Sequence, residues 1–110
     1  MKEFPMISYR EFDRWLEDGR IRFLVDVREP WMYENDRILG SVNIPYEEIE
    51  QNIDRIPREG MTVFYCDRGA KSLAVCRDLW RMGYEVADLA GGMFKYRGKY
   101  GDRRRLWELQ

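Results

Sequence analysis

The sequence predicts an α/β protein in which a mostly parallel sheet is covered by helices on both faces. Two observations carry this prediction. The chain contains several short apolar runs typical of buried strands, and the segments between them have apolar residues at helical spacing. Successive parallel strands need such a covering helix between them. The chain has 110 residues, of which 45% are hydrophobic, so it can fill one core, and we expect a single domain over residues 1–110.

The first third of the chain predicts one helix, one strand and a short second helix. Large apolar side chains recur at helical spacing within residues 9–18, and Gly19 provides a helix stop. Residues 23–27 form a short, nearly continuous apolar run, as in buried parallel strands. Because Pro30 is favourable in the first turn of a helix, we expect a short helix over residues 30–34.

The rest of the chain continues the alternation. Residues 41–44 predict a strand that ends before Pro45, and residues 46–56 place apolar side chains on one helical face. The next segments predict a strand over 61–65, a polar loop and a helix over about 73–82 that Gly83 stops. A strand over 84–89, a turn at Gly91 and Gly92 and a helix over 93–100 follow.

The charge balance gives no sign of a global attraction to nucleic acid or to a membrane. There are 19 basic and 20 acidic side chains, so the net charge is −1. The two halves differ, because residues 1–60 carry a net charge of −5 and residues 61–110 carry +4. Anionic ligands would therefore favour the second half.

The residue types present exclude several chemistries. The chain has two cysteines, Cys66 and Cys76, and no histidine, so it lacks a catalytic triad, a Cys–His dyad and the ligands of an ordinary zinc site. We expect neither a cofactor nor a metal. No apolar run approaches the roughly 18 residues of a membrane span, and the amino terminus lacks a long apolar core. We expect a cytoplasmic protein with reduced thiols and no membrane partner.

Cys66 is the strongest functional candidate because it lies between a predicted strand and a predicted helix. There it faces the free N–H groups and the dipole of the following loop and helix, which favour a thiolate. Gly69 can adopt a backbone conformation that turns successive N–H groups inward as an anion-binding nest. The candidate site residues are Cys66 as the reactive group and, as the surrounding loop, Asp67, Arg68, Gly69, Ala70, Lys71 and Ser72.

Within this loop, Arg68 and Lys71 add positive charge at the rim, and Asp67 opposes them by one charge. Ser72 can cap the helix or form a hydrogen bond with the sulfur. A cradle of N–H groups around a cysteine suits three tasks: it can stabilise a thiolate, hold a persulfide, or hold a phosphoryl or arsenyl group on sulfur.

A resemblance of the loop sequence to the loops of known families favours one of these three tasks. Residues 66–72 read Cys-x-x-Gly-x-Lys-Ser, which resembles the active-site loop of the rhodanese-like sulfurtransferases, commonly Cys-x-x-Gly-x-Arg-Ser. The related cell-cycle tyrosine phosphatases have a loop one residue longer that ends in arginine. That position is Ser72 here, so the phosphatase interpretation is weak.

The resemblance extends over about 90 residues. Residues 26–30, 33–34 and 40–45 are similar to the first signature of the family, and residues 84–93 are similar to its closing strand and turn. The resemblance implies the rhodanese fold, a five-stranded parallel sheet with helices on both sides. The sequence departs from the family pattern at Met32, Asp36, Arg37, Tyr96 and, within the loop, Lys71 in place of arginine.

The resemblance also implies a ping-pong sulfur transfer. The Cys66 thiolate would take the outer sulfur of thiosulfate or of a persulfide, and cyanide or an acceptor thiol would then remove it. The partners implied are a small anionic sulfur donor and a thiol or cyanide acceptor, with a protein sulfur acceptor as a further candidate. The alternative is a non-catalytic rhodanese-like module with a binding or regulatory role, which loss of Cys66 would have favoured.

The remaining candidates have structural interpretations. We expect Cys76 to pack in the core, since it shares a helical face with Leu73 and Leu79, and Asp26 and Arg28 to form an ion pair that holds adjacent loops. We expect Trp107 and Leu109 to pack on the domain or against a second subunit. We also expect a solvated helix end, and no nucleic-acid site, from a basic segment that comprises Lys95, Arg97, Lys99, Arg103, Arg104 and Arg105.

Overall fold

A central parallel sheet of five strands organises the molecule, which is represented by a computed structural model that describes residues 3–103. The strand order is β1-β6-β5-β2-β4, and every neighbouring pair is parallel. The fold class predicted from the alternation of strands and helices is thereby confirmed. The strands are β1 (Met6–Ile7), β2 (Ile21–Asp26), β4 (Val42–Asn43), β5 (Met61–Tyr65) and β6 (Val86–Leu89).

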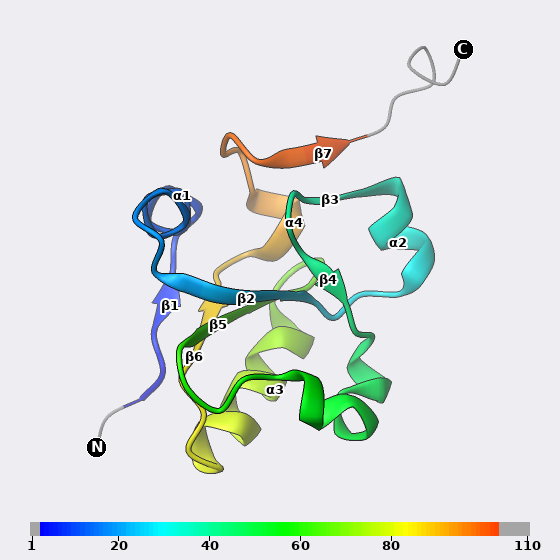
Figure 1. Cartoon of the computed structure of the whole chain (residues 1–110). Coiled ribbons are helices and arrows are strands. Elements are labelled where there is room, and N and C mark those ends of the chain that lie inside the picture. The colour runs from blue at the N-terminus through cyan, green and yellow to red at the C-terminus, as the bar shows by residue number, and fades with distance from the viewer. Residues whose placement is uncertain (1–2, 104–110) are drawn as a thin grey trace.

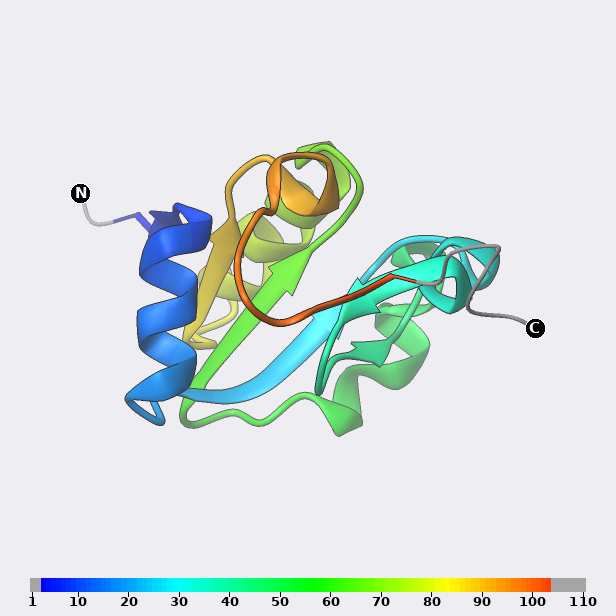
Figure 2. The same cartoon turned by 90° about the horizontal axis from the view of Figure 1, so that it is seen from above.

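Helices cover both faces of this sheet (Figures 1 and 2). One face carries α1 (Tyr9–Glu17) and the short α4 (Gly92–Lys95), whereas the other carries α3 (Ala70–Arg81) with the 3₁₀ helices η1 (Tyr46–Glu48) and η2 (Glu50–Arg55). Helix α2 (Pro30–Asn35) lies beyond the end of β2. Two buried clusters result, one on each face of the sheet.

Two predicted helices differ from the structure. Residues 46–56 form two 3₁₀ segments in place of an α-helix, and the backbone is not helical at Asn52. The helix expected over 93–100 ends at Lys95. After it, β7 (Gly101–Arg103) pairs antiparallel with β3 (Asp36–Ile38), so part of the basic segment is a strand. Arg104, Arg105, Trp107 and Leu109 lie outside the described residues.

The sheet places its carboxyl edge where the candidate loop begins. Strand β5 has β2 on one side and β6 on the other, with Asp26 opposite Tyr65 and Asp88 opposite Phe64. Strand β5 is also where the sequence prediction and the structure have the same bounds. Cys66 therefore follows the middle strand of the sheet, beyond the edge at which parallel α/β sheets bind ligands.

Candidate active site

The Cys66 sulfur lies at the base of the loop and is buried, with 4% of the residue exposed. Two backbone N–H groups donate to it, that of Gly69 at 3.1 Å and that of Ser72 at 3.5 Å. The Ser72 hydroxyl lies 3.4 Å from the same sulfur. These fixed donors favour negative charge on sulfur, because each hydrogen bond strengthens as the acceptor becomes anionic.

The loop reaches this geometry through a left-handed residue at Gly69, where φ is +114°. A side chain is strained in that region, which is why glycine serves there. The turn reverses the chain so that the Gly69 N–H points back at the sulfur and α3 begins at the next residue. Glycine at this position therefore permits the contact that the sequence predicted.

The glycine pair after β6 holds the outer side of the loop. The N–H of Met93 donates to the carbonyl oxygen of Cys66 at 3.0 Å, and that of Phe94 donates to the carbonyl oxygen of Asp67 at 2.9 Å. With φ of +57°, Gly92 lies so close that a Cβ atom there would overlap the Cys66 carbonyl oxygen. The carbonyl groups of Cys66 and Asp67 thus point toward α4.

The rest of the loop offers unpaired hydrogen-bond donors. Within residues 3–103, no protein acceptor contacts the backbone N–H groups of Asp67, Arg68, Ala70 and Lys71. Free N–H groups at the start of a helix form a site for anions. Such donors can stabilise charge on a second sulfur attached to Cys66.

The two cationic side chains of the loop are engaged with their neighbours at the surface. The Lys71 ammonium lies 3.4 Å from a Glu47 carboxylate oxygen and 5.6 Å from the Tyr46 ring centroid. The Arg68 guanidinium stacks 3.9 Å from the Phe94 ring centroid, and its Nε lies 3.7 Å from an Asp67 carboxylate oxygen. Both cations therefore sit at the rim, with part of their charge offset by a carboxylate.

Asp88 is a site residue that was not singled out from the sequence. It is 1% exposed, and its Oδ1 lies 2.5 Å from the Ser72 hydroxyl oxygen, while its Oδ2 has no hydrogen-bond partner among the described residues. Burial raises the pKa of this carboxyl to about 6, although the Ser72 bond lowers it in part. A charged residue inside the apolar strand 86–89 was the available signal.

Cys76 lies in the core on the α3 side of the sheet and is fully buried. Burial raises the pKa of its thiol, and the charges of Asp88 and Cys66 raise it further. Both cysteines are free. A buried, protonated Cys76 fits the expected packing role.

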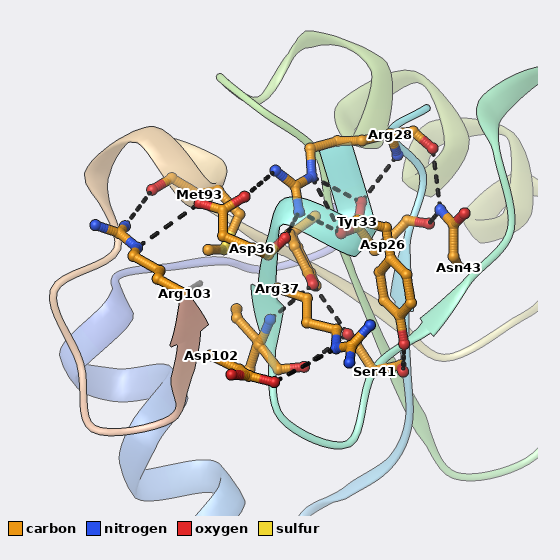
Figure 3. Close-up of polar contacts among 12 residues, drawn as sticks. Asp26, Arg28, Tyr33, Asp36, Arg37, Ser41, Asn43, Met93, Asp102 and Arg103 are labelled. Atoms are coloured by element: carbon orange, nitrogen blue, oxygen red, sulfur yellow. Dashed lines mark hydrogen bonds and ion pairs between the residues drawn. The ribbon is translucent and has the colours of Figure 1, made fainter. Parts of the chain in front are cut away.

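Asp26 and Arg28 form a buried ion pair, which agrees with the structural role expected for them. The guanidinium donates to both Asp26 oxygens, with Nη2 at 2.7 Å from Oδ2, and Nη1 donates to Asp36 at 3.0 Å (Figure 3). Burial opposes the charge on Arg28, but the bonds from Asp26 and Asp36 outweigh it and raise the pKa. The amide of Asn43 donates to the carbonyl oxygens of both Asp26 and Arg28.

Two departures from the family pattern belong to the same network. Asp36 contacts Arg28 and also lies 3.7 Å from the Arg103 Nε, and Arg37 lies 3.7 Å from an Asp102 oxygen (Figure 3). These contacts link β3 to β7. The unusual residues therefore hold the second, two-stranded sheet and do not reach the sulfur loop.

Residues 3–103 contain no group of three or more Asp, Glu or Cys side chains placed to hold a metal ion. Among the helices described, none is long and apolar enough to cross a membrane.

The described residues form a parallel α/β sheet in which a cysteine and a loop of unpaired backbone N–H groups follow the middle strand. Comparison with known proteins identifies the family within this fold class. Residues 8–99 match the family model for the rhodanese-like domain, and the chain belongs to this family.

The chain is similar to several bacterial proteins. It is 32% identical to a sulfurtransferase of Allochromatium vinosum over 91 aligned residues, and this alignment covers 82% of this chain and 85% of the relative. It is 35% identical over 71 residues to thiosulfate sulfurtransferase PspE of Escherichia coli, covering 63% and 68%. It is also 35% identical over 77 residues to the uncharacterized protein YqhL of Bacillus subtilis, but it spans only 61% of that protein's length.

The solved structures agree with the fold. A rhodanese-related protein from Thermoplasma volcanium superposes with a TM-score of 0.82 at 22% identity, covering 92% of this chain and all of the other. The rhodanese fold implied by the sequence motifs is thereby confirmed.

Proposed function

We propose that the protein is a sulfurtransferase in which Cys66 carries the transferred sulfur as a persulfide. The observation that carries this proposal is that the Cys66 sulfur accepts hydrogen bonds from the backbone N–H groups of Gly69 and Ser72. The unpaired N–H groups next to it supply donors for a second sulfur. Fixed donors of this kind are usually the largest catalytic contribution where negative charge develops.

In the first half-reaction, the Cys66 thiolate attacks the outer sulfur of an anionic donor such as thiosulfate. A sulfur–sulfur bond forms to Cys66, the bond between the donor sulfurs breaks, and sulfite leaves with the electron pair. The free N–H groups of the loop then surround the terminal sulfur. Lys71 and Arg68 at the rim attract the donor, although Glu47 and Asp67 offset part of their charge.

In the second half-reaction, cyanide or an acceptor thiolate attacks the terminal sulfur and restores the Cys66 thiolate. Thiosulfate as the donor is supported by the likeness to PspE, which is named a thiosulfate sulfurtransferase. A protein acceptor is a further candidate partner. We place the activity in the cytoplasm, where the free thiols of Cys66 and Cys76 stay reduced.

Intact-mass analysis after incubation with thiosulfate tests the proposal. The wild-type protein should gain the mass of one sulfur atom and lose it again when cyanide is added. The Cys66→Ser variant should gain nothing, whereas the Cys76→Ala variant serves as the matched control and should gain sulfur as the wild type does.

Two results would contradict the proposal. If the wild-type protein gains no sulfur from thiosulfate or from glutathione persulfide, the non-catalytic binding module is the better description. If Cys66→Ser gains as much as wild type, the sulfur is carried elsewhere.

A further inference from the structure

The Ser72 hydroxyl connects the Cys66 sulfur to a buried carboxyl group. Its oxygen lies 3.4 Å from the Cys66 sulfur, 3.3 Å from the Gly69 carbonyl oxygen and 2.5 Å from Asp88 Oδ1. A hydroxyl has one hydrogen to donate. The protonation state of Asp88 therefore determines whether the hydroxyl directs its hydrogen or a lone pair toward the sulfur.

An ionised Asp88 takes the hydroxyl hydrogen, because a bond from O–H to a carboxylate is the strongest of the three. Ser72 then turns a lone pair toward sulfur, which opposes a thiolate. A protonated Asp88 instead donates its own hydrogen to the Ser72 oxygen. The hydroxyl hydrogen is then free to donate to the Cys66 thiolate.

Within the part of the chain that the structure describes, burial and the Ser72 hydrogen bond are the influences on the charge of Asp88. Helix α3 brings the Ser72 hydroxyl and the Cys76 thiol toward it, and β5, which Cys66 follows, pairs Phe64 with it. Strand β1 places the apolar Met6 opposite it. Among residues 3–103, no cation pairs with Asp88, and its Oδ2 has no hydrogen-bond partner.

We propose that Cys66 and Asp88 share one proton through the Ser72 hydroxyl, so that Asp88 takes up a proton when Cys66 becomes a thiolate. The proposal rests on the assignment of Cys66 as the reactive sulfur. Asp88 is a positioning residue in this scheme, since it acts on the sulfur only through Ser72.

The proton transfer balances without any further reactant. The thiol proton of Cys66 moves to the Ser72 oxygen while the Ser72 hydroxyl proton moves to Asp88 Oδ1. The starting thiol and carboxylate become a thiolate and a carboxylic acid, and the total charge of the pair stays at minus one. The raised pKa of Asp88, about 6, suits a group that exchanges a proton near neutral pH.

Two groups coupled in this way titrate as a pair. Thiolate should form in two steps as the pH rises. In the first step the pair loses one proton, and part of the resulting charge lies on sulfur. In the second, Asp88 and Cys66 are both charged, which their mutual repulsion delays to higher pH.

The test measures how fast iodoacetamide alkylates Cys66 across pH 5–10, in the reduced full-length protein, with peptide mass analysis to assign the modified cysteine. Wild type, Asp88→Asn and Ser72→Ala are compared, together with the double variant. Asn is nearly isosteric with Asp and can donate a hydrogen bond to Ser72, but it cannot accept the proton.

The wild-type rate should rise in two steps, whereas the Asp88→Asn rate should rise in one step that lies between them. At pH 7, one unit above the pKa of Asp88, the Asp88→Asn variant should be alkylated up to about tenfold faster than the wild type, because the competing negative charge of Asp88 is absent. In the Ser72→Ala background, the same Asp88→Asn change should alter the rate much less, because the connecting hydroxyl is gone.

A single step in wild type that superimposes on the Asp88→Asn profile would overturn the proposal. So would an Asp88→Asn effect of equal size with and without the Ser72 hydroxyl, since the coupling would then not pass through it. A purely structural Asp88 would leave the profile unmoved. Alkylation requires no sulfur donor, so a protein that takes up no sulfur from thiosulfate or from glutathione persulfide would refute the proposed function and leave this test intact.

Discussion

The backbone N–H of Met93 donates to the carbonyl oxygen of Cys66 at 3.0 Å, which joins the turn after β6 to the Cys66 loop. Two hydrogen bonds on the outer side of the loop therefore orient the peptide groups on its inner side. The Gly91-Gly92 turn supports the site without touching the sulfur.

Substitution of Gly92 should damage both stability and sulfur uptake. In Gly92→Ala, the new Cβ atom would meet the backbone of Cys66 and Asp67 and would also occupy a left-handed position. We expect a loss of about 2–4 kcal/mol in the free energy of unfolding, measured by urea denaturation, and at least a tenfold slower persulfide formation. Gly19→Ala is the matched control, since Gly19 is left-handed with no atom near its Cβ position. Equal effects of the two substitutions would refute the close-contact explanation.

The buried ion pair should matter far more than the exposed ones. Arg28→Ala removes the cation that pairs with the fully buried Asp26, and we expect a destabilisation of about 3–5 kcal/mol in urea. Lys99→Ala, which removes an exposed partner of Glu17, should leave the unfolding midpoint nearly unchanged. An Arg28→Ala protein as stable as Lys99→Ala would show that the network in Figure 3 contributes little.

Stability should depend on pH through Asp88. The pKa of this carboxyl rises from an ordinary 3.8 to about 6 on folding, so the folded state binds the proton more tightly. Stability is therefore lost as the pH rises from about 4 to about 6, by roughly 3 kcal/mol in total. The advantage of Asp88→Asn over wild type should grow between pH 5 and pH 7 in paired urea titrations. A constant difference would mean that Asp88 does not titrate in this range.

Charge at the rim should tune the apparent affinity for thiosulfate. Lys71→Ala should raise the KM for thiosulfate, and Glu47→Gln should lower it, because Glu47 offsets the Lys71 charge. Each change should be roughly two- to fivefold and should shrink in high salt. The measurement is steady-state kinetics with cyanide as acceptor. If Glu47→Gln also lowers KM in the Lys71→Ala background, its effect does not act through Lys71.

The sequence was sufficient to place the Cys66 loop in the fold. Within residues 61–65, Met61 is half-buried and the other four are buried on both faces of the sheet, so this run specifies both the strand and its end, and Cys66 follows at once. The Gly69 turn was predictable for a local reason, because only glycine adopts its φ readily.

The small antiparallel sheet could not be predicted in this way. Strands β3 and β7 have three residues each and are mostly polar, so neither shows an apolar pattern. Their pairing depends on charges far apart in the chain, Asp36 with Arg103 and Arg37 with Asp102. The segment 96–99, part of the expected helix over 93–100, is instead held by a tertiary contact, because Asp13 accepts hydrogen bonds from the Tyr96 hydroxyl and from the backbone N–H of Lys99.

Asp88 was missed for a different reason. Its position in the strand could be read from the sequence, but its contact with Ser72 joins residues 16 apart on different elements. An acidic residue in an apolar strand signals a partner, although it does not identify one.

The strand order has a consequence for behaviour at high protein concentration. The two outer strands of the central sheet, β1 and β4, contain only two residues each. An outer strand this short offers few unpaired backbone groups to a neighbouring molecule, which is one way in which natural sheets prevent edge-to-edge aggregation. The longer strands that could template such growth, β2, β5 and β6, lie inside the sheet with neighbours on both sides.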